Sequence, residues 1–139
     1  FTGIDIAPSA IEQAQQKLPY ENVSFIEADL RDMENLELPP QNLIMAISVF
    51  QSSSILRDQL LTYMVRRLAA ERCTFLIGFP DSRYSRLRLL QGAATAHNAR
   101  PDYAKLVKDL RYYSRYFASH RYRVTLGGRY YVILTASSF

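Results

Sequence analysis

The amino-acid sequence predicts an α/β fold, in which a mostly parallel sheet carries helices on both faces. Strand-like and helix-like runs alternate along most of the 139 residues, and this alternation is typical of parallel sheets. Two strand-like runs are apolar without polar alternation, as expected of parallel strands buried on both faces. Gly127-Gly128 separates the last two strand-like runs and indicates a β-hairpin, because tight hairpin turns need positive φ angles. We therefore expect one domain with one antiparallel strand at the edge of its sheet.

The first half of the chain alternates strand with helix. Pro8 suits a first helical turn, where its missing N–H costs nothing, and apolar residues follow it at helical spacing. Residues 43–49 (LIMAISV) form one of the two unalternating apolar runs. The expected elements are strands at 1–6, 23–27 and 43–49 and helices at 8–18 and 55–70.

The second half begins with a strand at 74–79, closed by Gly78 and Pro80. Residues 81–100 predict a loop or a weak helix, whereas 102–117 show the clearest helical pattern of the chain. The apolar stripe of that helix consists of Tyr103, Leu106, Val107, Leu110, Tyr113 and Phe117. Strands are expected at 122–126 and 130–135 on either side of the glycine pair.

Composition excludes several classes of protein and site. No apolar run approaches the roughly 20 residues of a membrane helix, so we expect no membrane span. Cys73 is the single cysteine, which excludes an internal disulfide and fits a cytoplasmic protein. It starts an apolar run, and we expect a buried, unreactive thiol. His97 and His120 form no metal-binding pair, so we expect no metal site.

Charge is distributed unevenly along the chain. Residues 1–70 carry 5 basic and 9 acidic side chains, whereas residues 71–139 carry 12 basic and 4 acidic ones. The basic second half suits an anionic substrate or a nucleic acid, and it also fits a solvated basic surface.

Acidic residues follow two of the predicted strands. In open α/β sheets, ligands bind beyond the carboxyl ends of the strands. Asp5 ends the first strand, where a carboxylate can accept hydrogen bonds from both hydroxyls of a ribose. Alternatively, the negative charge of Asp5 only stabilises the N-terminus of the helix that begins at Pro8. Ala28-Asp29-Leu30 follow the second strand, where a carboxylate can accept a hydrogen bond from the amino group of an adenine. The pair predicts a nucleoside site.

Five stretches resemble the class I S-adenosylmethionine-dependent methyltransferases, from the second strand of that family to the seventh. They are GIDIAPSAIEQAQQKL, NVSFIEADLRD, NLIMAISVFQS, CTFLIGFP and RVTLGGRYYVILTA. The resemblance implies a Rossmann-like fold, S-adenosylmethionine as cofactor, and a partial methyltransferase domain over 1–139 with an insertion at about 81–117. An ordinary nicotinamide-binding fold also has an acid at Asp5 but usually lacks the final reversed strand.

The resemblance also implies roles for individual residues. Asp5 would bind the ribose hydroxyls, Ile6 would pack on the adenine, and Asp29 with the backbone of Ala28–Leu30 would hold the adenine edge. Ser48 would lie beside the methionine moiety. Val49, Phe50 and Gln51 would line the route to the methyl acceptor.

The acceptor must be inferred from the segment after the fifth strand of the family. Arg83 and Tyr84 lie there and suit a small, anionic acceptor, unless the segment is only a solvated basic loop. The stretch RYYSRYFASHRYR interleaves arginine with tyrosine and suits RNA as an alternative acceptor. No motif typical of nucleobase methylation follows the fourth strand of the family.

One feature of the family is missing from these residues. Its glycine-rich loop follows a first strand that lies between the strands expected here at 1–6 and 43–49. The sequence begins at Phe1, within the second strand of the family, so we expect these residues to be a fragment truncated before the glycine-rich motif. We therefore expect two unpaired strand edges and poor cofactor binding by this chain alone. A non-catalytic chain that pairs with another subunit through these edges is the third alternative.

Overall fold

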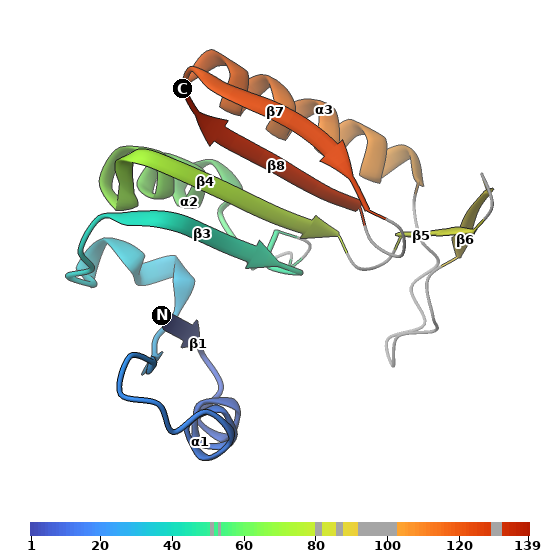
Figure 1. The fold of residues 1–139 in the computed structure, drawn as a ribbon. Helices are drawn as coiled ribbons and strands as arrows, with labels where there is room; N and C mark the ends of the chain where they lie inside the picture. Colours follow the sequence, from blue (N-terminus) through green and yellow to red (C-terminus); the bar gives the residue numbers. More distant parts are fainter. Residues whose placement is uncertain (51, 53, 80–81, 86–87, 92–102, 129–131) are drawn as a thin grey trace.

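The larger sheet of the protein has four strands in the order β3-β4-β8-β7 (Figure 1). The computed structural model describes all residues except 51, 53, 80–81, 86–87, 92–102 and 129–131. The four strands are β3 (Gln41–Ile47), β4 (Ala69–Phe79), β7 (Tyr122–Gly127) and β8 (Val132–Ser138). β3 is parallel to β4, whereas β8 is antiparallel to both β4 and β7. The predicted hairpin is therefore present, but the reversed strand β8 lies inside the sheet and β7 forms the edge.

A smaller sheet forms at the N-terminal end of the chain from β1 (Thr2–Asp5) and β2 (Ser24–Glu27), which are parallel. Helix α1 (Pro8–Lys17) connects them, with Pro8 in its first turn and Ile11 buried. Among the described residues, β1 pairs only with β2 and β3 pairs only with β4. In the described part of the chain, the two sheets therefore share no backbone hydrogen bonds between strands. The gap lies between β1 and β3, the two strands that would flank the expected central strand of the family.

Helices α2 (Arg57–Tyr63) and α3 (Tyr103–Ser119) both cover one face of the four-stranded sheet (Figure 1). α2 continues into a single π-helical turn, η2 (Met64–Leu68), and a 3₁₀ helix, η1 (Leu30–Asn35), follows β2. The core lies between these helices and the sheet. Its largest fully buried side chains are Tyr113, Phe75, Phe79, Phe117, Leu61, Ile77 and Leu134.

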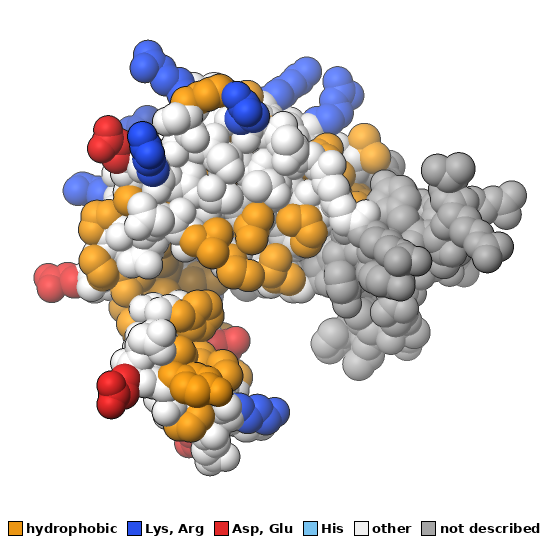
Figure 2. All heavy atoms as spheres, viewed as in Figure 1, with side chains coloured by type: hydrophobic (Ala, Val, Ile, Leu, Met, Phe, Trp, Pro, Cys, Tyr) orange, Lys and Arg blue, Asp and Glu red, His pale blue; other side chains and the backbone are white. Residues whose placement is uncertain are grey.

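The prediction that residues 43–49 are buried on both faces is wrong. Ile44 and Ala46 face the helices and are buried, but Leu43, Met45 and Ile47 are 52%, 54% and 45% exposed. Figure 2 shows hydrophobic side chains gathered on the face of the molecule turned away from α2 and α3. The physical reason is that both helices pack on the same face, so no described element covers the other face of β3.

Two segment boundaries also differ from the prediction. The helix expected to end at residue 70 ends at Leu68, and β4 begins at Ala69, because Ala69 pairs with Gln41 at the start of β3. Pairing between strands overrides the helical spacing of residues in this segment. Where a loop or weak helix was expected, β5 (Ser82–Ser85) and β6 (Arg88–Gln91) form an antiparallel pair.

The predicted stripe of α3 is correct at its centre. Tyr113 and Phe117 are buried, and Leu106 and Leu110 are half-buried against the core, but Val107 is 56% exposed. Placing Val107 in the buried stripe was therefore wrong. Val107 lies on the exposed flank of the helix with Lys108 and Arg111, because the helix turns Leu110, Tyr113 and Phe117 toward the core instead.

Cys73 is buried at the start of the apolar part of β4, as predicted. Burial raises the pKa of its thiol to about 11. Because the thiolate is the reactive form, this side chain acts as core packing near neutral pH.

Candidate functional site

The carboxyl ends of β1 and β2 bring the two predicted acidic positions together. Asp5 lies opposite Glu27 in the parallel pair, and its backbone carbonyl accepts a hydrogen bond from the N–H of Ala28 at 3.0 Å. Ile6 follows with 60% of its surface exposed. This edge therefore has two acidic side chains, Asp5 and Asp29, near an exposed apolar side chain, and an acid at the end of such a strand can accept hydrogen bonds from ribose hydroxyls.

The carboxylate of Asp5 also organises the start of α1. Its Oδ1 accepts the backbone N–H of Ala7 at 2.8 Å, and Ala7 is the residue before the first helical turn. Asp5 thus contributes to the start of α1, which was the alternative role expected for this residue. Oδ2 accepts no hydrogen bond from the described residues, so one oxygen orients the carboxylate and the other is free to bind a ligand.

Asp29 is engaged by Arg31, a residue that the predicted site did not include. Its Oδ1 accepts the backbone N–H of Arg31, and its Oδ2 accepts from the Arg31 guanidinium, with Nε at 2.8 Å. These hydrogen bonds hold the pKa of the Asp29 carboxyl below its usual value. Asp29 is therefore ionised, but an adenine would have to share it with Arg31. The spacing Asp-x-Arg at the start of a helix was the signal in the sequence.

Leu30 offers a backbone donor beside Asp29. It is the first residue of η1, where an N–H group has no intrahelical acceptor. Its side chain packs half-buried against the core, which fixes the backbone here. The role of the Ala28–Leu30 backbone at an adenine edge stays a prediction, and the Ala28 N–H already donates to the carbonyl of Asp5.

Ser48 adopts an unusual backbone conformation directly after β3. Its φ angle is +63°, in the left-handed region, although it is not glycine. Its N–H donates to the carbonyl of Gly78 on β4 at 3.0 Å, and the residue is exposed. A left-handed residue other than glycine costs about 1–2 kcal/mol, and such strain concentrates at functional sites. This observation supports the prediction that Ser48 lies at a binding site.

Replacing Ser48 by glycine should stabilise the protein. We expect Ser48→Gly to raise the free energy of unfolding by about 0.5–1 kcal/mol, because removal of the left-handed strain outweighs the added entropy of the unfolded chain. Ser9→Gly, at an exposed position in α1, should lower it by a similar amount. Urea unfolding of both variants tests this, and a loss of stability in Ser48→Gly would show that the conformation carries no strain.

The structure places the residues expected to line the acceptor route in different surroundings. Phe50 is half-buried, and its ring packs on Tyr113 of α3 with centroids 5.2 Å apart. It therefore anchors the segment after β3 to the core. Gln51 lies outside the described residues. The backbone of Arg83 and Tyr84 lies in β5, but their side chains are also outside the described part of the chain.

A polar cluster between α2 and α3 was not predicted. Arg57 places its guanidinium 4.0 Å from the ring centroid of Tyr112 and donates to Asp109 at 3.2 Å. The hydroxyl of Tyr112 donates to Asp58 in the first turn of α2. The cluster ties the start of α2 to α3 near Phe50. Its partners are more than 50 positions apart, so no local spacing indicates them.

Neither a metal site nor a membrane span is seen in the described residues. No three side chains among their histidines, cysteines, aspartates and glutamates converge as a metal site requires. None of the described helices combines the length and the apolar character that crossing a membrane demands.

Solved structures share this fold, although no protein-family model and no curated protein matches the sequence. A protein from Clostridium thermocellum described as an rRNA-methylase aligns with a TM-score of 0.60 and 13% identity, over 99% of this chain and 72% of that one. The N-methyltransferase NodS from Bradyrhizobium japonicum, in complex with S-adenosyl-L-homocysteine, aligns with a TM-score of 0.56 and 15% identity, over 99% and 65%. Magnesium protoporphyrin IX methyltransferase from Synechocystis, with the same ligand bound, aligns with a TM-score of 0.55 and 15% identity, over 99% and 63%.

The chain thus spans 63% to 72% of the length of these three structures, and nearly all of it aligns with each of them. The fold is therefore shared with these structures although only 13% to 15% of the aligned residues are identical. This chain has the fold of the S-adenosylmethionine-dependent methyltransferases.

Proposed function

We propose that this chain takes part in methyl transfer from S-adenosylmethionine and that it holds the adenosine half of the cofactor. The observation that carries the proposal is the meeting of Asp5 with Ala28–Leu30 at adjacent strand ends. Two of the structures with this fold contain S-adenosyl-L-homocysteine, the demethylated form of that cofactor.

The chain's own residues would bind and orient the cofactor. Oδ2 of Asp5 would accept the ribose hydroxyls, while Oδ1 stays bonded to Ala7 and fixes the carboxylate. Ile6, already exposed beside it, would cover one face of the adenine. Ser48, at the carboxyl end of β3, would lie toward the methionine half.

Positioning is the main contribution that this arrangement would make to the reaction. When bound, S-adenosylmethionine supplies a methyl group on a sulfonium, which is already an activated leaving group. In-line transfer then depends on alignment of donor and acceptor, with a general base only where the acceptor must lose a proton.

We infer that the acceptor is small and anionic, and that the segment after β4 contacts it through Arg83 and Tyr84. Their residue types favour a carboxylate or a phosphate. RNA is the second candidate acceptor, favoured by the basic second half of the chain and by the likeness to the protein described as an rRNA-methylase. A non-catalytic role, in which another subunit pairs with the free edges of β1 and β3, is the remaining alternative; size-exclusion chromatography showing only monomer would count against it.

The adenosine proposal is tested by nuclear magnetic resonance with adenosine as the probe. Titration of adenosine should shift the backbone amide signals of Ile6 and of Ala28–Leu30. Asp5→Asn should weaken adenosine binding about 10-fold, because a neutral amide replaces charge-assisted hydrogen bonds to the ribose. The side-chain carbonyl oxygen of the introduced asparagine can still accept from Ala7, so the helix start should survive the change.

Asp32→Asn is the matched control, since it removes the same charge from an exposed position in η1. It should leave adenosine binding nearly unchanged. Equal weakening in both variants, or shifts confined to other strands, would refute the site.

A further inference from the structure

We propose that the outer face of α3, together with the turn that follows it, forms a binding surface for single-stranded RNA. The surface lies outside the proposed adenosine site. It requires neither the cofactor nor methyl transfer, so RNA binding there stands or falls separately from the proposed function.

The first observation is an excess of basic over acidic side chains. Residues 103–139 contain seven lysines and arginines and one acid, Asp109, which is bonded to Arg57. Lys108, Arg111 and Arg115 are exposed on one flank of α3 at helical spacing. None of these three takes part in a salt bridge within the described residues.

The positive charge extends past the end of α3, because Arg121 is exposed in the turn between α3 and β7. In Figure 2, several Lys and Arg side chains lie along the border of the molecule where Figure 1 shows α3 and β7. Arg123 on β7 is also exposed, but its neighbours Tyr122 and Val124 pack against the core beneath α3, so Arg123 lies on the opposite face of the sheet. The positive surface is therefore formed by α3 and the turn that follows it.

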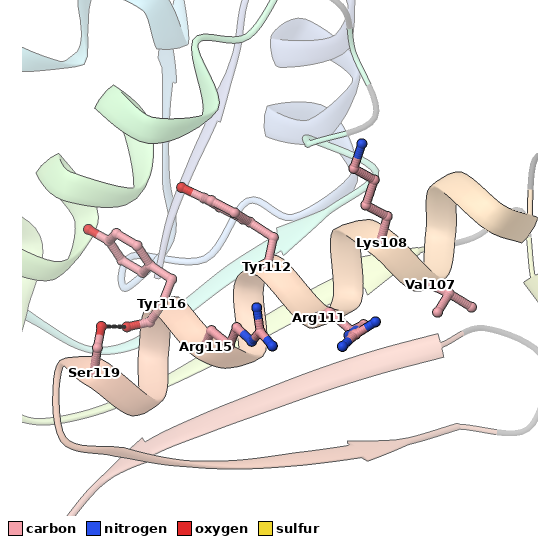
Figure 3. Close-up of a pocket in the computed structure, with 7 residues that line it drawn as sticks. All are labelled: Val107, Lys108, Arg111, Tyr112, Arg115, Tyr116 and Ser119. Carbon is pink, nitrogen blue, oxygen red and sulfur yellow. Dashed lines mark hydrogen bonds between the residues drawn. The ribbon is translucent and has the colours of Figure 1, made fainter.

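The second observation is a shallow groove that contains aromatic rings. Figure 3 shows Tyr112 and Tyr116 on one side of it and Arg111 and Arg115 on the other. The rings of Tyr112 and Tyr116 stack with centroids 6.4 Å apart, and His120 stacks on Tyr116 at 4.4 Å. A row of aromatic rings thus runs beside a row of cations along the helix; Arg57 covers part of Tyr112 and His120 covers one face of Tyr116, so a base would stack on the surfaces that these two residues leave open.

This combination favours single-stranded RNA over other anionic partners. Cations that follow a nucleic-acid backbone, together with rings on which unpaired bases stack, are the two elements of single-strand recognition. An anionic membrane would instead require a broad apolar surface beside the cations, and among the described residues that line these grooves only Val107 and Leu126 are large, apolar and strongly exposed. An acidic protein would make no use of the ring row.

Fluorescence anisotropy with a labelled single-stranded RNA of about 12 nucleotides tests the proposal on the whole chain, without cofactor. Arg111→Gln combined with Arg115→Gln should weaken binding at least about 10-fold at low salt. The slope of log K against log salt should fall by about 1.4, the value for two lost phosphate contacts on a single strand. Tyr116→Leu should also weaken binding about 10-fold, through lost stacking.

The matched control removes two charges elsewhere, with Lys17→Gln on α1 and Arg72→Gln on β4, both exposed. It should leave the affinity within about 2-fold of the unmodified chain and the salt slope unchanged. Thermal unfolding of every variant checks that the fold persists. Equal weakening by the two double variants, no RNA binding at low salt, or a preference for phosphatidylserine vesicles over RNA would each overturn the proposal.

Discussion

Phe117→Ala should lower the free energy of unfolding by about 3–5 kcal/mol, since it removes a large ring from a close-packed core. Phe117 is fully buried on α3. Its ring lies 4.9 Å from that of Phe75 on β4 and 5.8 Å from that of Tyr122 on β7, measured between centroids. The substitution therefore opens a cavity where a helix and two strands meet. Domains of this size have total stabilities of about 5–15 kcal/mol, so a large fraction of that stability would be lost.

Val107→Ala, in the same helix, is the control for Phe117→Ala. The apolar pattern alone placed Val107 in the buried stripe, whereas the structure leaves it mostly exposed. Its replacement should change stability by no more than about 0.5 kcal/mol, and alanine's higher helix propensity favours a small gain. Urea unfolding of both variants measures the contrast. A large loss in Val107→Ala would mean that the outer flank of α3 is packed against something in solution.

The alternation of helix and strand was predictable because it depends on short-range spacing. The helical positions of Ile11, Tyr113 and Phe117 are all buried, and the glycine pair at 127–128 does mark the end of a strand in a hairpin. The length of β4 was not predictable in the same way. Its first residues pair with Gln41, and such long-range pairing leaves no trace in the local pattern.

The candidate site was predictable in its positions but not in its hydrogen bonds. Parallel strands place Asp5 and Ala28 at one edge, which follows from topology alone. Occupation of the Asp29 carboxylate by Arg31 depends on a side-chain rotamer, and the contact of Arg57 with Tyr112 depends on how two helices pack. Three-dimensional packing decides both, so neither could be read from spacing.

The burial of β3 on one face only was the main feature of the fold that the sequence did not predict, and a pair of lysines can test it. Ile77→Lys on β4 should prevent folding or cost more than about 4 kcal/mol, because it places an unpaired charge in the core beneath the helices. Met45→Lys on β3 should cost less than about 1 kcal/mol, because Met45 is 54% exposed on the opposite face. The two substitutions lie in neighbouring pairs of the β3–β4 ladder, because Ile77 pairs with Ala46 and Met45 pairs with Leu76. They therefore compare the two faces of the sheet at nearly the same place.

Circular dichroism during thermal unfolding measures both lysine variants, and sedimentation measures their oligomeric state. If Met45→Lys also prevented folding, the outer face of β3 would have to be covered in solution, and the unmodified chain should then sediment as a dimer or larger. If Met45→Lys folds as a monomer with near-normal stability, the apolar residues of that face are dispensable for the fold of these residues. Leu43, Met45 and Ile47 would then be apolar for a reason other than the stability of this chain, and contact with a partner or a ligand is the usual role of such a surface.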